Sequence, residues 1–201
     1  MTATPRRLIV GISGASGIVY GVRLLEILRR TDIQTHLVVS SAAKVTLSLE
    51  TELTLPDLLA LADVVYPTND IGAAISSGSF RTEGMIVCPC SMRTLAEIAN
   101  GITASLLSRA ADVVLKERRR LVLVARETPL HLGHLRNMAA VTEMGAIVYP
   151  PVPAMYAKPV SIDEMIDHTV GRALDLFGID TGTVRRWREP PDEPGGEPNG
   201  V

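Results

Sequence analysis

Hydrophobic and polar positions follow a repeating order along the chain. A short continuous apolar run is followed by a stretch whose apolar residues recur with helical spacing, and this unit repeats several times. Continuous apolar runs are typical of parallel strands that are buried on both faces. The expected strands are 8–12, 35–39, Val64–Tyr66, 84–89, 121–125 and 146–149. The expected helices are 17–30, 42–50, 94–99, 104–116, 132–144 and 162–176.

This order predicts an α/β fold in a single domain, with a doubly wound, mostly parallel Rossmann-like (flavodoxin-like) sheet. We expect the domain to span residues 1–180 and the polar residues 181–201 to form a C-terminal tail that is at least partly disordered. In such sheets, ligands bind at the carboxyl ends of the strands. Polar residues gather at those ends, at 13–17, 40, 90–94, 126–127 and 156. We therefore expect one site along this edge.

Composition narrows the classes of partner. The chain has 201 residues and a net charge of −2, which gives no reason to expect nucleic acid or a membrane surface as partner. Neither a signal peptide nor a run long enough to span a membrane is expected, so the prediction is a cytoplasmic protein. Cys88 and Cys90 lie on one expected strand with a single residue between them, and we expect them to point to opposite faces and not to form a disulfide.

The glycine-rich turn after the first strand favours a mononucleotide over NAD. Its glycines are Gly11, Gly14 and Gly17, which is not the G-x-G-x-x-G spacing of dinucleotide sites. The second strand ends in Ser40 and Ser41, where a dinucleotide site would place an acidic residue for the ribose. FMN fits better. A tight turn without a ligand is an alternative that the loop by itself leaves open.

A second polar turn follows the fourth strand, at Cys88-Pro-Cys-Ser-Met-Arg-Thr94. Its backbone amides and the hydroxyls of Ser91 and Thr94 could hold an anion at a helix N-terminus, although Ser91 alone is also explained as an N-cap. His131 and His134 stand three apart on an expected helix, but two ligands do not complete a metal site.

Taken together, these segments resemble the UbiX-type flavin prenyltransferases, in order and over roughly residues 7 to 180. The matching segments are Gly11-Ile-Ser-Gly-Ala-Ser-Gly17, Leu47-Ser-Leu-Glu-Thr51, Ser76-Ser-Gly-Ser79, Cys88-Pro-Cys-Ser91, Arg109-Ala-Ala-Asp-Val-Val-Leu-Lys-Glu-Arg-Arg119, Arg126-Glu-Thr-Pro129, Gly145-Ala-Ile-Val and Pro150-Pro-Val-Pro-Ala-Met-Tyr156.

The resemblance implies a metal-independent transferase that joins a dimethylallyl group from dimethylallyl phosphate to N5 and C6 of reduced FMN. The implied product, prenylated FMN, serves a UbiD-type decarboxylase. The resemblance also implies a homododecamer with its sites at subunit interfaces.

The resemblance implies three sets of site residues. Those for FMN are Gly14, Ala15, Ser16, Ser40, Ser91, Met92, Arg93, Thr94 and Arg126. Those for the prenyl phosphate are Arg109, Lys116, Tyr156 and Arg172. The catalytic set is Ser16, Glu50 and Glu127. Cations and a phenol hydroxyl suit this reaction because negative charge builds on the departing phosphate. Ser16 is expected to orient N5, and Glu50, Glu127 or the released phosphate to take the protons.

Alternatives remain at this point. Glu127 could simply cap the following helix, and Arg109 and Lys116 could belong to an ordinary solvated helix face. An FMN-dependent cysteine decarboxylase would carry a Pro-x-Met-Asn motif and an early histidine, whereas this chain has Pro89-Cys-Ser-Met92 and Glu50. An aromatic-acid decarboxylase would need a group that activates a carboxylate, and none is evident. A non-catalytic FMN-binding module would need the flavin loops but no second basic pocket.

Overall fold

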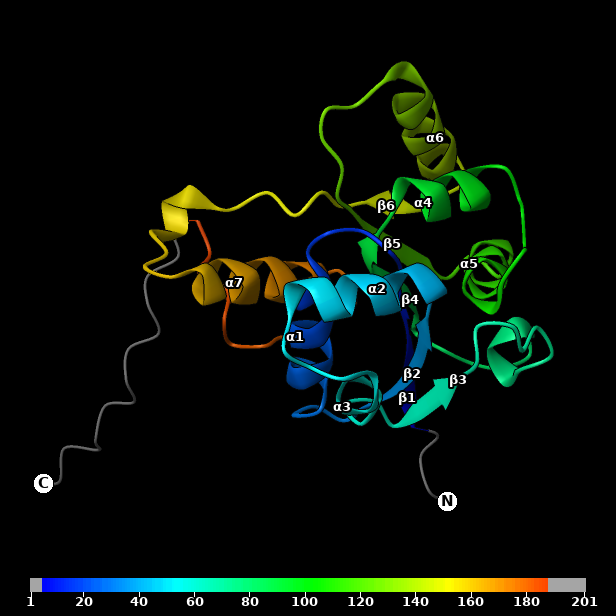
Figure 1. Ribbon diagram of the computed structural model, residues 1–201, viewed down its shortest axis with the longest axis horizontal. Helices are drawn as coiled ribbons and strands as arrows, with labels where there is room; N and C mark the ends of the chain where they lie inside the picture. The colour runs from blue at the N-terminus through cyan, green and yellow to red at the C-terminus, as the bar shows by residue number, and fades with distance from the viewer. Residues whose placement is uncertain (1–4, 188–201) are drawn as a thin grey trace, which may run out of the picture.

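Strands and helices alternate along the chain (Figure 1). The computed structural model describes residues 5–187. The strands are β1 (Arg6–Ile12), β2 (Ile33–Val39), β3 (Val64–Tyr66), β4 (Gly84–Cys90), β5 (Arg120–Ala125) and β6 (Ile147–Val148). The α-helices are α1 (Ile18–Leu28), α2 (Ser41–Glu50), α3 (Leu55–Leu59), α4 (Met92–Ala99), α5 (Leu106–Lys116), α6 (Leu132–Glu143) and α7 (Ile162–Asp175). Two 3-10 turns, η1 (Ala74–Ser76) and η2 (Met155–Ala157), lie in the loops.

The strands form one parallel sheet in the order β3-β2-β1-β4-β5-β6. Val10 at its centre stands opposite Leu37 on one side and Ile86 on the other. This is the six-stranded Rossmann order, so the predicted doubly wound fold is confirmed. The strand order reverses between β1 and β4, and the carboxyl edge there is the usual place for a ligand.

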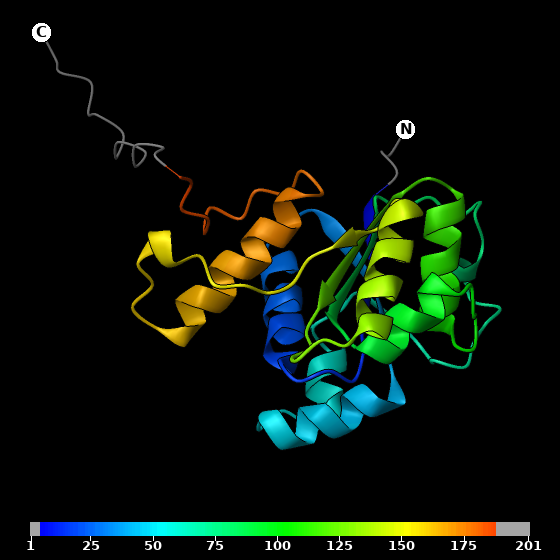
Figure 2. The same cartoon turned by 90° about the horizontal axis from the view of Figure 1, so that it is seen from above.

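Helices cover both faces of the sheet. Figure 2 shows α1 and α7 on one side and α4, α5 and α6 on the other. Each face of the sheet has its own hydrophobic core, and β1 contributes to both. Val10 packs against the core under α1 and α7, and Ile9 packs against the core under α4, α5 and α6. Cys88 lies in the first core and Cys90 in the second, so they point to opposite faces as predicted, and both are free thiols. The reason differs from the predicted one: residues i and i+2 of a regular strand share a face, and the register shift between Val87 and Cys90 separates the two.

Two helix starts differ from expectation because of caps, and one capped helix was not expected. α4 begins at Met92, two residues early, since Ser91 is its N-cap. α5 begins at Leu106, two residues late, since Ser105 forms a capping box with Ser108. α3 was not expected at all, although Thr54 and Asp57 form a capping box around its first turn.

Residues 181–187, the first part of the predicted tail, lie against α7. The rest of that tail, and its expected disorder, lie outside the described residues, and the domain boundary at residue 180 stays a prediction. None of the helices within residues 5–187 has the length and apolar character needed to cross a membrane. The cytoplasmic location stays a prediction.

Candidate active site

Three helices begin at one cavity on the carboxyl edge of the sheet. Each is capped by a serine hydroxyl: Ser40 accepts from the Ala43 amide at 3.1 Å at the start of α2. Ser91 and Ser105 do the same for α4 and α5. The cavity has a volume of about 210 Å³. Its lining includes Gly14, Ser40, Thr68, Ser91, Arg93, Thr94 and Ser105. Arg93 in this lining is paired with Glu97 at 3.1 Å, so the positive potential comes from the three helix N-termini. Their free amides make the cavity suited to a phosphate group such as that of FMN.

Five of the nine residues predicted to bind FMN line this cavity, namely Gly14, Ser40, Ser91, Arg93 and Thr94. Ala15 and Met92 neighbour Gly14 and Ser91 in the sequence. Both are buried and do not line the cavity. Thr68 and Ser105 were missed because they lie in loops without a motif. The signal for Ser105 was its position directly before an apolar helical stretch.

The loop between β1 and α1 packs tightly onto the start of α2. A Cβ atom added to Gly14 would lie 2.3 Å from the Cβ of Ala42, so only glycine fits there. A second contact ties this loop to the one after β4. The buried hydroxyl of Ser13 donates to the Pro89 carbonyl at 3.0 Å and accepts from the Ser91 amide at 2.8 Å. The two polar turns expected to hold the flavin are therefore fixed to each other.

Glu50 reaches from the end of α2 to the start of α1. Its Oε2 accepts hydrogen bonds from the amides of Gly17 at 2.8 Å and Ile18 at 3.0 Å, and its carboxylate also bonds the Ser16 side chain. Burial raises the pKa of Glu50, but these hydrogen bonds and the charge of Arg126 outweigh it and hold the pKa below its ordinary value. Because these amides already hold a carboxylate, an external phosphate fits the serine-capped cavity instead.

Two tyrosines that the sequence did not single out, Tyr20 and Tyr149, lie close together around Cys88. Burial raises the pKa of Tyr20, the nearby Cys88 thiol adds to the rise, and the charge of Arg126 opposes it. Burial likewise raises the pKa of Tyr149, with the charge of Arg172 opposing. Tyr20, Cys88 and Tyr149 lie around one small apolar gap, where the charge of Arg126 acts on Tyr20 and the charge of Arg172 acts on Tyr149. The only signal for Tyr149 was its place at the carboxyl end of β6.

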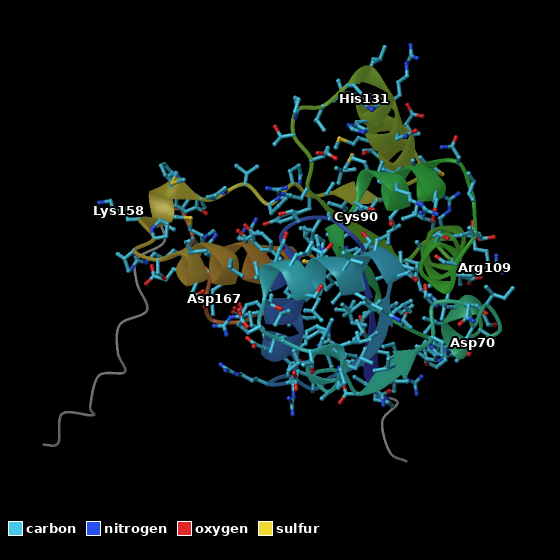
Figure 3. The ribbon with its side chains drawn as sticks, in the orientation of Figure 1. Asp70, Cys90, Arg109, His131, Lys158 and Asp167 are labelled. Atoms are coloured by element: carbon cyan, nitrogen blue, oxygen red, sulfur yellow. The ribbon has the colours of Figure 1, made fainter. Side chains whose placement is uncertain are left out.

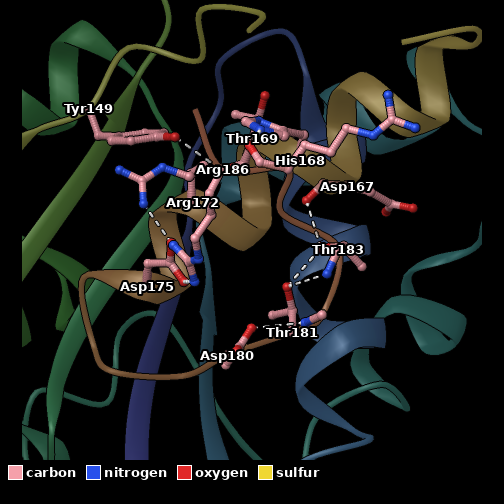
Figure 4. A network of polar contacts seen from close by, with 12 residues as sticks. Tyr149, Asp167, His168, Thr169, Arg172, Asp175, Asp180, Thr181, Thr183 and Arg186 are labelled. Carbon is pink, nitrogen blue, oxygen red and sulfur yellow. Dashed lines mark hydrogen bonds and ion pairs between the residues drawn. The ribbon is translucent and has the colours of Figure 1, made fainter. Parts of the chain in front are cut away.

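Two of the four residues predicted for the prenyl phosphate lie near each other. Arg172 on α7 and Tyr156 in η2 both act electrostatically on Tyr149. Arg172 donates to Asp175 at 2.6 Å (Figure 4), and the Tyr156 ring packs edge-on against His168 at a centroid distance of 5.8 Å.

The other two lie on α5, on a different side of the molecule. Arg109 donates to Asp112 at 2.9 Å and Lys116 to Glu117 at 2.6 Å. Figure 3 shows Arg109 at the opposite side of the chain from Lys158, which directly follows η2. A single chain therefore does not bring Arg109 and Lys116 to Tyr156 and Arg172.

Glu127 is exposed beside Arg126 and accepts a hydrogen bond from the Thr128 amide at 3.0 Å. It does not cap α6, so that alternative is wrong. His131 is the cap, with its Nδ1 accepting from the amides of Gly133 and His134. Across residues 5–187, no group of three or more His, Cys, Asp or Glu side chains could hold a metal ion.

Comparison with known proteins agrees with this geometry. The Flavoprotein family model matches residues 2–174. A flavin prenyltransferase UbiX of Neisseria meningitidis serogroup B is 60% identical over 183 residues, which are 91% of this chain and 97% of that protein.

Two solved structures are similar over most of the chain. The structure of AnUbiX in complex with FMN and dimethylallyl pyrophosphate has a TM-score of 0.91 at 54% identity, covering 92% of this chain and 99% of that one. A dodecameric FMN-dependent UbiX-like decarboxylase from Escherichia coli O157:H7 has a TM-score of 0.89 at 52% identity, covering 91% and 100%. By family match, sequence identity and fold, this chain belongs to the Flavoprotein family and, within it, to the UbiX-type flavin prenyltransferases.

Proposed function

We propose that this chain transfers a dimethylallyl group from dimethylallyl phosphate to N5 and C6 of reduced FMN, giving prenylated FMN. The observation that carries this proposal is the presence of two separate groups of residues that suit anions. The serine-capped cavity suits the FMN phosphate, and Arg172 with Tyr156 suits a second phosphate. The charge of Arg126 acts on both Glu50 and Tyr20. A module that only binds FMN needs no second anion site.

Reduced FMN, when bound, supplies the nucleophilic N5 and C6 positions. The chain supplies the groups that hold and polarise the reactants. Ser16 is fixed by Glu50 and orients the flavin edge. Because the pKa of Glu50 is lowered, its carboxylate is a weak base at neutral pH, and it is better suited to stabilise positive charge on the allyl group than to take a proton. That assigns the protons to Glu127 or to the released phosphate.

At the other end, the Arg172 guanidinium can bond two phosphate oxygens at once, and the Tyr156 hydroxyl can donate to a third. Negative charge builds on this phosphate as the allylic C–O bond breaks, so fixed donors there lower the barrier. Metal independence remains part of this proposal.

Arg109 and Lys116 complete this pocket from a neighbouring copy of the chain. Two observations support this arrangement: α5, which carries the first pair, lies on the other side of the chain from α7 (Figure 1), and the relative from Escherichia coli is dodecameric. We infer the same homododecamer for this protein, and a UbiD-type decarboxylase as the recipient of its product.

The test is to combine the protein with reduced FMN and dimethylallyl phosphate and follow the flavin spectrum. We expect a spectral change with wild type, while Arg172→Ala binds FMN normally and gives no change. Equal loss of FMN binding and prenylation in Arg172→Ala would show that the second pocket is misplaced. Release of carbon dioxide from a phenolic acid by this chain alone would favour the decarboxylase alternative.

A further inference from the structure

We propose that residues 181–187, here called the C-terminal strap, position Arg172 and Tyr156 for the prenyl phosphate. This inference rests on the proposed function. The strap follows α7 and folds back along it. Near its end, Arg186 bonds Asp175, which is also the partner of Arg172 (Figure 4), and the Trp187 ring packs on Tyr156.

The first contact is a shared carboxylate. Asp175 accepts from Arg172 at 2.6 Å and from Arg186 at 2.9 and 3.3 Å. Its side chain is only 14% exposed, whereas those of Arg172 and Arg186 are 44% and 41% exposed. Burial raises the pKa of Asp175, but the two arginines outweigh this and keep the carboxylate charged.

This arrangement leaves net positive charge where the phosphate is expected. Two guanidinium groups face one carboxylate, so the cluster keeps one positive charge. Without Arg186, Asp175 would neutralise Arg172 and compete with the phosphate for its donors.

The second contact is aromatic. The Trp187 ring packs edge-on against the Tyr156 ring at a centroid distance of 5.2 Å, and His168 packs against the same ring. Arg185 fixes the backbone on both sides of this cluster. Its guanidinium donates to the Ala157 carbonyl at 2.9 Å, and its own carbonyl bonds His168 at 3.2 Å. The strap therefore limits the positions that the Tyr156 hydroxyl can take.

A small residue on α7 lets the strap come this close. A Cβ atom added to Gly171 would lie 2.7 Å from the Val184 side chain and 2.8 Å from the hydroxyls of Thr181 and Thr183. Gly171 directly precedes Arg172, so the strap lies over the turn of α7 that carries Arg172, the residue proposed to bind the prenyl phosphate.

The test measures the binding of dimethylallyl phosphate to the FMN-loaded oligomer by calorimetry, together with kcat and KM for prenylation. We expect Arg186→Gln to raise both Kd and KM for dimethylallyl phosphate about tenfold, with the Kd for FMN unchanged. Arg186→Lys keeps the charge and should stay within about threefold of wild type. Arg136→Gln removes an exposed arginine from α6 as the matched control and should change nothing.

Trp187→Ala tests the aromatic contact without changing charge. It should raise KM for dimethylallyl phosphate about tenfold, and Trp187→Phe should restore it. Unchanged prenyl-phosphate affinity in Arg186→Gln and Trp187→Ala would overturn the proposal, as would an equal loss of FMN affinity. Wild-type protein that binds dimethylallyl phosphate without prenylating FMN would contradict the proposed function and leave the binding test of the strap valid. Wild type with no affinity for dimethylallyl phosphate would overturn both.

Discussion

At the scale of single residues, hydroxyl groups organise the flavin edge. The segment around Ser91 favours a helix cap, and the resemblance implies a flavin contact. The two are compatible, because the Ser91 hydroxyl oxygen accepts from the Thr94 amide while the residue also lines the cavity. Ser13 could be placed at a strand end from the sequence. Its bridging role could not, because its partners Pro89 and Ser91 lie 76 and 78 residues away in the chain.

Ser13→Ala should lower both stability and FMN affinity. The substitution leaves the Ser91 amide without its buried acceptor, which we expect to cost about 1–3 kcal/mol of unfolding free energy. Urea denaturation and flavin titration measure the two effects. Ser48→Ala, which removes an exposed hydroxyl on α2, is the control and should change neither. Wild-type stability in Ser13→Ala would contradict the bridging role.

Glu50 should stabilise the fold in a pH-dependent way. Its folded-state pKa is lowered, so its contribution is fully present above its ordinary pKa of 4.5 and is lost as the pH falls through the folded value. We expect Glu50→Gln to be about 0.5 kcal/mol less stable than wild type at neutral pH. This difference should shrink toward zero between about pH 6 and about pH 3.

Denaturation of both proteins across that range measures the difference. Glu52→Gln removes an exposed carboxylate two residues along and is the control. A difference that stays constant down to the lowest pH would show that the charge of Glu50 does not act on α1.

At the scale of elements, the apolar runs were enough to predict the four longer strands, β1, β2, β4 and β5, because parallel strands buried on both faces admit few polar residues. The short edge strands β3 and β6 are only partly buried, yet their apolar residues also marked them. Helix ends were less predictable. α5 begins at Leu106 because Ser105 and Ser108 bond each other, a local preference that apolar spacing does not report. The convergence of three helix N-termini on one cavity depends on the strand order, which the sequence pattern leaves open.

The serine caps should therefore have separable effects on stability and on FMN binding. Ser40→Ala, Ser91→Ala and Ser161→Ala each remove an N-cap, so each should cost about 1 kcal/mol of unfolding free energy. Only Ser40 and Ser91 line the cavity, so only their variants should also bind FMN more weakly, by about tenfold. Loss of FMN affinity in Ser161→Ala to the same extent would contradict this separation.

At the scale of the whole molecule, the predicted site is divided between two sides of the chain. The sequence brought Arg109, Lys116, Tyr156 and Arg172 together only through resemblance. The fold keeps the first two on α5 and brings Arg172 and Tyr156 to Tyr149. The sequence of one chain could not predict this contact between copies, because residues that meet across a symmetric interface have no characteristic spacing in the sequence.

Two inactive variants should therefore restore each other when mixed. Lys116→Ala and Arg172→Ala each damage every site in their own oligomers. Random reassembly from equal amounts should give some sites both intact residues, and so roughly a quarter of wild-type prenylation activity. The measurement is activity after mixing, dissociation and reassembly, with each variant treated alone as control. No recovery, with mixed oligomers confirmed by mass, would place both residues in a site within one chain.

The most direct test of the central claim is the mass of the flavin after reaction. Wild-type protein, reduced FMN and dimethylallyl phosphate are incubated without added metal, and the extracted flavin is analysed by mass spectrometry. We predict a flavin heavier than FMN by one five-carbon dimethylallyl unit, with phosphate released in equal amount. Recovery of unchanged FMN from protein that has bound both reactants would contradict the assignment of this chain as a flavin prenyltransferase.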